Sequence, residues 1–208
     1  MRYIDKMVLK PPDINTKTLS LLVVLFFISG LMLGCYLFAI DKGEIDKDRF
    51  TISQSLAFCN KAIAITLFSL AMVVTLILNY MRGGEAFLLY LRYLLIFISY
   101  GLIITIIYVT TFYNKSLHFK FAGVIFLSQL LYIFTVSYIY NSYLDKKSDL
   151  LIPVDFNIIL IICTFTLLVV FGVFEEDDTS EFQNIIFASS ELITVFLNLL
   201  PVLYLGFI

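Results

Sequence analysis

The chain has 208 residues, of which 61% are hydrophobic and 14% are charged, and its mean hydropathy is +0.97. Because soluble domains are roughly half apolar and about one-quarter charged, this composition excludes a soluble globular protein and predicts a membrane protein. The formal net charge of −2, with no basic run longer than Lys146-Lys147, excludes a nucleic-acid partner.

Six apolar runs are long enough to cross a bilayer, which takes about 20 residues for about 30 Å of hydrocarbon. We therefore predict an all-α polytopic membrane protein, a six-transmembrane-helix bundle over residues 19–208 that follows a polar cytosolic segment, 1–18. The predicted spans are about 19–40, 55–80, 87–112, 119–143, 151–174 and 184–208. The segments between the spans are too short to fold as separate domains.

The distribution of Lys and Arg predicts the orientation of this bundle, because these residues are enriched on the cytosolic side of membrane proteins. The first apolar run is longer than the core of a cleavable signal peptide, about 7–15 residues, so we expect it to remain as an anchor. With the N-terminus inside, the cytosolic side holds Arg2, Lys6, Lys10, Lys17, Arg82, Arg92, Lys146 and Lys147, against Lys42, Lys47, Arg49, Lys115 and Lys120 opposite. This bias predicts that both termini are cytosolic and that the acidic EEDDTSE loop faces the lumen or the exterior.

Small residues in the spans indicate close helix packing. Gly30 and Gly34 form a GxxxG motif in the first span, which lets a neighbouring backbone approach, and we favour a neighbour from the same chain over a dimer partner. Cys35, Cys59 and Cys163 lie in predicted spans without CxxC spacing, so we interpret them as small buried apolar residues. We predict no disulfide framework, metal site or cofactor.

Charged residues lie inside the second, third and last predicted spans. At about 1.5 Å per residue, Lys61 and Glu191 would both lie roughly 9–13 Å below the lumenal rim. Two interpretations stay open: the two residues form an ion pair, or the Lys61 ammonium extends to the lipid headgroups. Arg92, five residues into the third span, is expected to extend to the headgroups on the cytosolic side.

The fourth span begins with candidate polar residues on the predicted lumenal side. Asn114 starts the sequon Asn114-Lys115-Ser116 and is a glycosylation candidate. His118, the only histidine, shares a helix face with Gln129 and Tyr132, because Ala122 and Phe126 continue the steps of three and four. His118 is read either as an interfacial residue or as a catalytic base.

The last span carries a polar stripe, because Glu191, Thr194 and Asn198 follow at steps of three and four residues. Pro201 continues this stripe at a point where the helix could kink. The candidate binding or intramembrane polar residues of the whole chain are Lys61, His118, Gln129, Glu191, Thr194 and Asn198.

The fourth span, HFKFAGVIFLSQLLYIFTVSYIY, carries His118, Ala122, Phe126 and Tyr132 after the segment YVTTFYN. It resembles the corresponding helix of the Frag/DRAM/Sfk family of six-span membrane proteins. The last span, IIFASSELITVFLNLLPVLYLGF, looks like the final helix of the branch that acts after GPI attachment to proteins. The first lumenal loop, DKGEIDKDRFTISQS, departs from the autophagy-modulator branch because it lacks that branch's Pro-Pro-Glu-Ser run.

The resemblance implies work on membrane lipids, in the endoplasmic reticulum or Golgi more than at the plasma membrane. We therefore expect a non-enzymatic protein that handles or organises lipids in GPI-anchor lipid remodelling or phospholipid homeostasis, as a subunit of a larger, lipid-transfer type of assembly. Its partners would be phospholipid or GPI lipid and other membrane proteins. One alternative is an acyl-transfer enzyme for lyso-GPI or lysolipid, with His118 as base and Glu191 orienting it. Another is a channel or transporter subunit lined by Lys61, Gln129, Glu191 and Asn198.

Overall fold

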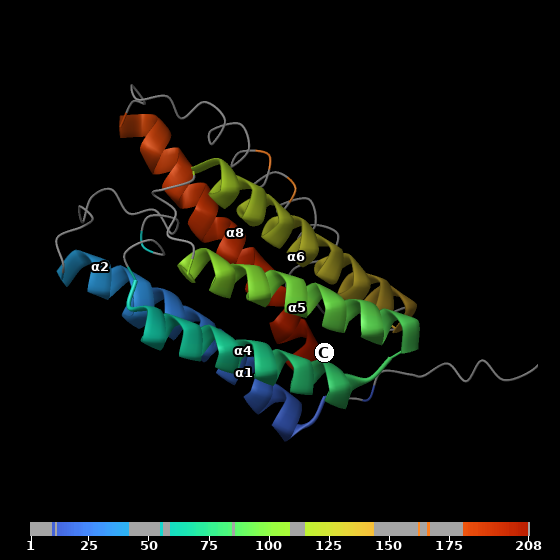
Figure 1. The fold of residues 1–208 in the computed structure, drawn as a ribbon. Helices are drawn as coiled ribbons and strands as arrows, with labels where there is room; N and C mark the ends of the chain where they lie inside the picture. The colour runs from blue at the N-terminus through green and yellow to red at the C-terminus, as the bar shows by residue number, and fades with distance from the viewer. Residues whose placement is uncertain are drawn as a thin grey trace, which may run out of the picture.

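The computed structural model describes residues 10, 12–41, 55, 59–84, 86–108, 115–143, 162, 166 and 181–207. Every regular element in these ranges is a helix, which confirms the all-α class for the part of the chain described (Figure 1). The elements are α1 (Ile14–Ser29), the π-helix η1 (Gly30–Tyr36), α2 (Leu37–Asp41), α4 (Lys61–Arg82), α5 (Ala86–Tyr108), α6 (Lys115–Tyr143) and α8 (Glu181–Phe207).

Within the described residues, three helices are long and apolar enough to cross a membrane: α1–η1–α2 over Ile14–Asp41, α4, and α5 over Ala86–Ile107. Within α6 the apolar stretch is shorter and covers Lys120–Val136. The predicted fifth span, 151–174, lies outside the described residues apart from two positions, and so does the predicted acidic loop EEDDTSE except for Glu181, at which α8 begins. The number of spans therefore stays a prediction.

The first helix begins at Ile14, five residues before the start of the predicted span, because a capping box precedes it. The Asp13 carboxylate accepts a hydrogen bond from the Thr16 backbone N–H at 2.7 Å, and the Thr16 hydroxyl accepts one from the Asp13 N–H at 2.9 Å. These bonds satisfy donors that a helix start otherwise leaves without partners. The capping box therefore lets α1 begin before the apolar run that starts at residue 19.

The second long helix, α4, begins at Lys61 and not at Ser55, because the Asn60 side chain caps it by accepting a hydrogen bond from the Ile63 N–H at 3.3 Å. It ends at Arg82, where Gly83 takes a positive φ of 67° and donates its N–H to the Asn79 carbonyl at 3.0 Å. A left-handed residue stops a helix at little cost only when it is glycine. The turn that follows leads directly into α5.

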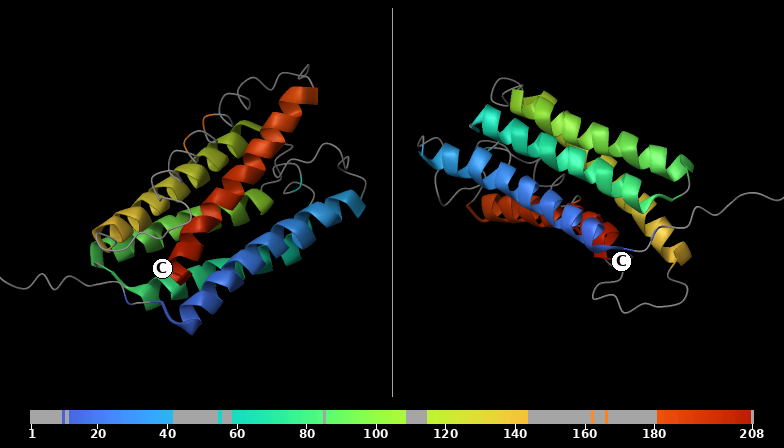
Figure 2. Two further views of the ribbon diagram at one scale, coloured as in Figure 1. Left: turned by 180° about the vertical axis from the view of Figure 1, so that it is seen from behind. Right: turned by 90° about the horizontal axis from the view of Figure 1, so that it is seen from below.

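The helices form a bundle in which the pairs with the most extensive packing run in opposite directions. α1 packs against α4 and α8, and α5 packs against α4 and α6. α1 and α5 run one way, while α4, α6 and α8 run the other way (Figures 1 and 2). We call the end where α1 begins and α8 finishes the terminal end, and the end where α4 begins the distal end.

Contacts between segments far apart in the sequence hold the terminal end together. The Lys10 backbone N–H donates to the Arg82 carbonyl at 3.0 Å, which joins the chain before α1 to the end of α4. Gly206 of α8 lies so close to α1 that an added Cβ would meet the Ser20 side chain. The first and the last described helices therefore meet at one end of the bundle.

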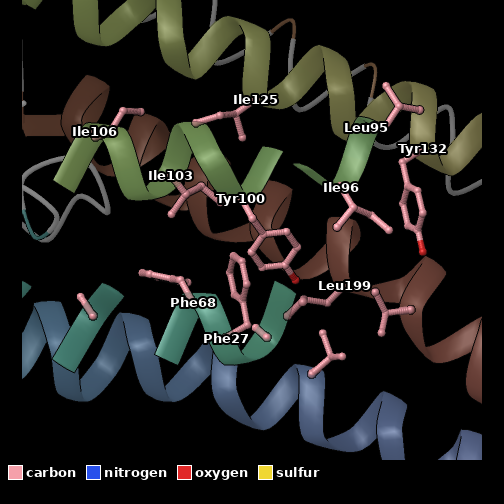
Figure 3. Close-up of a cluster of buried hydrophobic side chains, with 14 of the residues drawn as sticks. Phe27, Phe68, Leu95, Ile96, Tyr100, Ile103, Ile106, Ile125, Tyr132 and Leu199 are labelled. Atoms are coloured by element: carbon pink, nitrogen blue, oxygen red, sulfur yellow. The ribbon is translucent and has the colours of Figure 1, made fainter. Parts of the chain in front are cut away.

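The core lies where α1, α4 and α5 face one another (Figure 3). The Phe27 ring meets the Phe68 ring edge to face, with centroids 5.2 Å apart, and meets the Tyr100 ring at 6.1 Å. Such aromatic pairs contribute about 0.5–1.5 kcal/mol beyond their buried area. From α8, Leu199 reaches the same core, and from α6, Ile125 does so (Figure 3).

The outer surface of the bundle is apolar over much of its length. Large exposed side chains include Leu21 and Leu25 on α1, Ile77 on α4, and Leu94 and Phe97 on α5. A soluble monomer rarely exposes apolar surface this extensive. Together with the three membrane-length helices, this surface indicates an integral membrane protein.

Candidate functional site

Four polar side chains lie buried between α4, α5 and α6, and we call them the polar network: Thr75, Asn79, Tyr100 and Tyr132. Thr75 is 1% exposed and Asn79 is fully buried. The two residues come from α4 and stand one helical turn apart, so both point toward the same neighbours. Tyr100 arrives from α5 and Tyr132 from α6.

Hydrogen bonds connect the network across three helices. The Thr75 hydroxyl donates to the Ala71 carbonyl at 2.7 Å and lies 3.3 Å from the Tyr100 hydroxyl. Because a threonine has one hydroxyl hydrogen, Tyr100 must be the donor in that second bond. The Asn79 amide donates to the Thr75 carbonyl at 2.8 Å and to the Tyr132 hydroxyl at 3.0 Å.

Two arginines lie next to the network, where α4 ends and α5 begins. Arg82 is 1% exposed and Arg92 is fully buried. The expectation that Arg92 extends to the headgroups is therefore wrong. Its guanidinium folds back across the turn between the helices, and Nη2 donates to the Gly83 carbonyl. The carbonyls at a helix end lack partners within the helix, which makes Gly83 a strong acceptor for a buried cation.

The predicted lumenal residues lie on three helices that all begin at or beyond the distal end. Lys61 is exposed and is the first residue of α4, whereas the predicted second span starts at residue 55. Gln129 is half-buried on α6, and Tyr132, which is predicted to share its helix face, is 6% exposed. The helix backbones of α6 and α8 carry the other candidates, but their side chains lie outside the described part; these are His118, Glu191, Thr194 and Asn198.

Backbone register relates the level of Glu191 to that of Lys61. Gly206 lies beside Ser20, so counting back along α8 and forward along α1 brings Glu191 to about the level of η1. The Asn60 N–H donates to the Gly34 carbonyl at 2.7 Å, which fixes the start of α4 at the same level. Toward its start, however, α8 leans away from α1 and α4 (Figures 1 and 2). The Lys61–Glu191 pair remains a prediction, and Asn114 lies outside the described residues.

Neither the polar network nor the burial of the two arginines is predicted from the sequence. The available signal is the spacing of Thr75, Asn79 and Arg82, which follow at steps of four and three and so occupy one face of α4. The same face carries Phe68 and Ala71, which are buried. A polar stripe that continues an apolar, buried stripe indicates contacts inside the bundle.

The network is suited to fixing helices in place. Its hydroxyl and amide groups bond to one another and to backbone carbonyls, so the helices gain fixed rotational positions. Within the described ranges, no three His, Cys, Asp or Glu side chains gather closely enough to hold a metal ion.

Comparisons with known proteins complete this description. No protein-family model matches the chain, and neither the curated proteins nor the solved structures contain a match.

Proposed function

We propose that the protein is a non-enzymatic integral membrane protein that organises or handles lipids, as a subunit of a larger membrane assembly. The observation that carries the proposal is the outer surface of α1, α4 and α5, on which large apolar side chains are exposed along the length of each helix. Surface of this kind contacts acyl chains or other membrane helices. Most of the described recognition surface therefore lies within the membrane.

The chemistry of the terminal end supports contact with lipid headgroups. Lys17 is exposed near the start of α1, and its ammonium nitrogen lies 6.0 Å from the centre of the Phe207 ring. A cation beside an aromatic ring is typical of the membrane interface, where anionic headgroups attract basic side chains. Lys10 adds a second cation at this end through its backbone bond to α4.

For the topology, we propose six spans with both termini in the cytosol. Two observations support it: α1 begins where α8 ends, and four described cations, Lys10, Lys17, Arg82 and Arg92, lie toward this terminal end, against Lys61 and Lys120 toward the other. An even number of crossings returns the chain to its starting side. Positively charged residues favour the cytosol.

For the lipid and compartment, we propose a phospholipid or a GPI lipid in the endoplasmic reticulum or the Golgi. This part of the proposal rests on the resemblance of the segments around His118 and Glu191 to the Frag/DRAM/Sfk family. In the six-span topology, His118 and Glu191 would both lie on the lumenal side of the membrane.

The test isolates the full chain from its own membranes in polymer nanodiscs, without detergent, and measures the retained lipids and proteins by mass spectrometry. We expect one phospholipid or GPI-lipid class to be enriched several-fold over the bulk membrane, together with at least one membrane-protein partner. A six-span protein of unrelated sequence from the same membranes is the control. Lipids identical to those of the control, with no partner retained, would refute the proposal.

A further inference from the structure

Two cysteines far apart in the sequence meet at the distal end of the bundle. Cys35 lies in η1 and is fully buried, and Cys59 lies just before the cap of α4 and is 8% exposed. Both are free thiols, and they flank a backbone hydrogen bond that joins η1 to the cap of α4. The expectation that both are buried is confirmed, but their pairing is not visible in the sequence.

The backbone holds the two thiols together. The residues next to the cysteines, Asn60 and Gly34, share a backbone hydrogen bond of 2.7 Å. One turn into α4, Ala64 touches Gly34 so closely that an added Cβ would lie 2.8 Å from the Ala64 Cα. A disulfide needs Cα atoms about 4.4–6.8 Å apart, and the backbone bond between the flanking residues Gly34 and Asn60 brings the backbones beside the two cysteines together in this way.

The two thiols differ in reactivity. Cys59 directly precedes the N-cap of α4, and the neighbouring Cys35 thiol is the main cause that lowers the pKa of the Cys59 thiol. The positive charge of Lys61 lowers it further, while burial acts in the opposite direction. The thiolate is the nucleophile in thiol–disulfide exchange. Cys59, which retains some exposed surface, is therefore suited to react first.

We propose that Cys35 and Cys59 form a redox pair that closes into an intramolecular disulfide and ties η1 to the start of α4. The Cys59 thiolate attacks one sulfur of a small-molecule disulfide, such as glutathione disulfide, and expels one thiolate. Cys35 then loses its proton, attacks the Cys59 sulfur of the mixed disulfide and expels the second thiolate. Two protein thiols are oxidised, one external disulfide is reduced to two thiols, and the two protons balance the two departing thiolates.

The pair joins a π-helix to a helix start. π-helices interrupt the regular α-helical hydrogen-bond pattern, and they are frequent at functional positions. A covalent link beside Gly34 would hold η1 against α4 even if the surrounding packing loosened. The redox state of the pair would therefore control how freely this part of the bundle opens.

The test uses the full chain in mild detergent with Cys163→Ala, which leaves only the two cysteines in question. Glutathione disulfide is added to the folded protein, the remaining thiols are alkylated with a polymer-tagged maleimide after denaturation in sodium dodecyl sulfate, and the products are separated on a non-reducing gel. We expect two tags per chain before oxidation and none afterward, on a monomer whose mass falls by two hydrogen atoms. Dithiothreitol should restore both tags.

Two single variants in the same background test the order of attack. With Cys35→Ala, Cys59 should accumulate as a stable glutathione adduct, because no second thiol resolves it. With Cys59→Ala, the fully buried Cys35 should remain unmodified over the same time. If Cys163→Ala fails to fold, peptide mapping of the oxidised natural chain must find the linked Cys35–Cys59 peptides. Two tags retained after oxidation, a glutathione adduct on the paired protein, or a disulfide between chains would overturn the proposal.

Discussion

The distal and terminal ends of the bundle hold their helices together in different ways. At the distal end, Gly34 lets α4 approach so closely that the backbones of η1 and α4 are nearly in contact. From the middle of the bundle toward the terminal end, the polar network joins α4, α5 and α6 by hydrogen bonds between side chains. Lipid supplies little hydrophobic force between helices, so close packing and interhelical hydrogen bonds must provide the specificity. Close packing at the distal end is lost when a side chain is enlarged, whereas the hydrogen bonds of the polar network are lost when a polar group is removed.

The strongest test of this comparison is Gly34→Ala. The new Cβ would lie 2.8 Å from the Ala64 Cα, a backbone atom that cannot rotate away, so η1 and α4 must separate. Overpacking of this kind costs about 1–3 kcal/mol. We expect that loss in the free energy of unfolding, measured by titrating the purified protein from mild detergent into a denaturing detergent.

Gly101→Ala is the matched control for this substitution. It makes the same chemical change inside α5, but no atom lies within 4 Å of the added Cβ. Its free energy of unfolding should equal that of the natural chain or exceed it slightly, because alanine is the better helix former. Equal losses for the two variants would show that the close contact at the distal end contributes nothing.

The second test removes the longest-range bond of the polar network. Asn79→Ala and Tyr132→Phe each delete one partner of the 3.0 Å bond between α4 and α6. Interhelical hydrogen bonds in membrane proteins contribute about 0.6–1.7 kcal/mol, so the double-mutant cycle should give a coupling of about 1 kcal/mol. The measurement is again unfolding by denaturing detergent. Ser99→Ala is the control, because that buried hydroxyl donates only to the Leu95 carbonyl of its own helix.

How much of the fold is predictable from sequence depends on whether the cause is local. The length of each apolar run predicts a helix, because backbone groups in hydrocarbon must bond within their own segment. The helix ends depend on single capping side chains, whose effect is harder to predict from the sequence. Asn60 moves the start of α4 to Lys61, and Asp13 with Thr16 moves the start of α1 to Ile14.

Contacts between helices are not predictable in the same way. Asn79 and Tyr132 are 53 residues apart, and each alone is an ordinary polar residue in an apolar run. Their pairing depends on how α4 and α6 are rotated, which one sequence does not specify. For the same reason, the proximity of Cys35 and Cys59 is not predictable from the sequence. Arg92 illustrates the opposite error, because a long cation near a helix end is normally assigned to the headgroups, whereas here the Gly83 carbonyl binds it inside the bundle.

A third, smaller effect is expected at the other bond of the polar network. Thr75→Val and Tyr100→Phe remove the 3.3 Å contact between α4 and α5, which is longer than the bond to Tyr132. The Thr75 hydroxyl keeps its donor bond to Ala71 in the Tyr100→Phe variant, so only the acceptor side is lost. The cycle should give a coupling of about 0.5 kcal/mol by the same unfolding assay. A coupling larger than that of Asn79 with Tyr132 would reverse the ranking of the two bonds.

The smallest effect should arise from the capping box at the terminal end, where Asp13 lies just before the membrane-length helix. The Thr16 backbone N–H is the main cause that lowers the pKa of the Asp13 carboxyl below its ordinary value of 3.8. A carboxyl with a depressed folded pKa adds its full stabilisation above 3.8 and loses it as the pH falls through the lower folded value. Hydrogen exchange of the Thr16 amide should therefore accelerate in this acid range, beyond the intrinsic change with pH, while the buried network shows no matching change. Asp13→Asn keeps a capping oxygen without the titrating proton and should abolish the effect, whereas the same acceleration in that variant would mean that another group opens the first turn of α1.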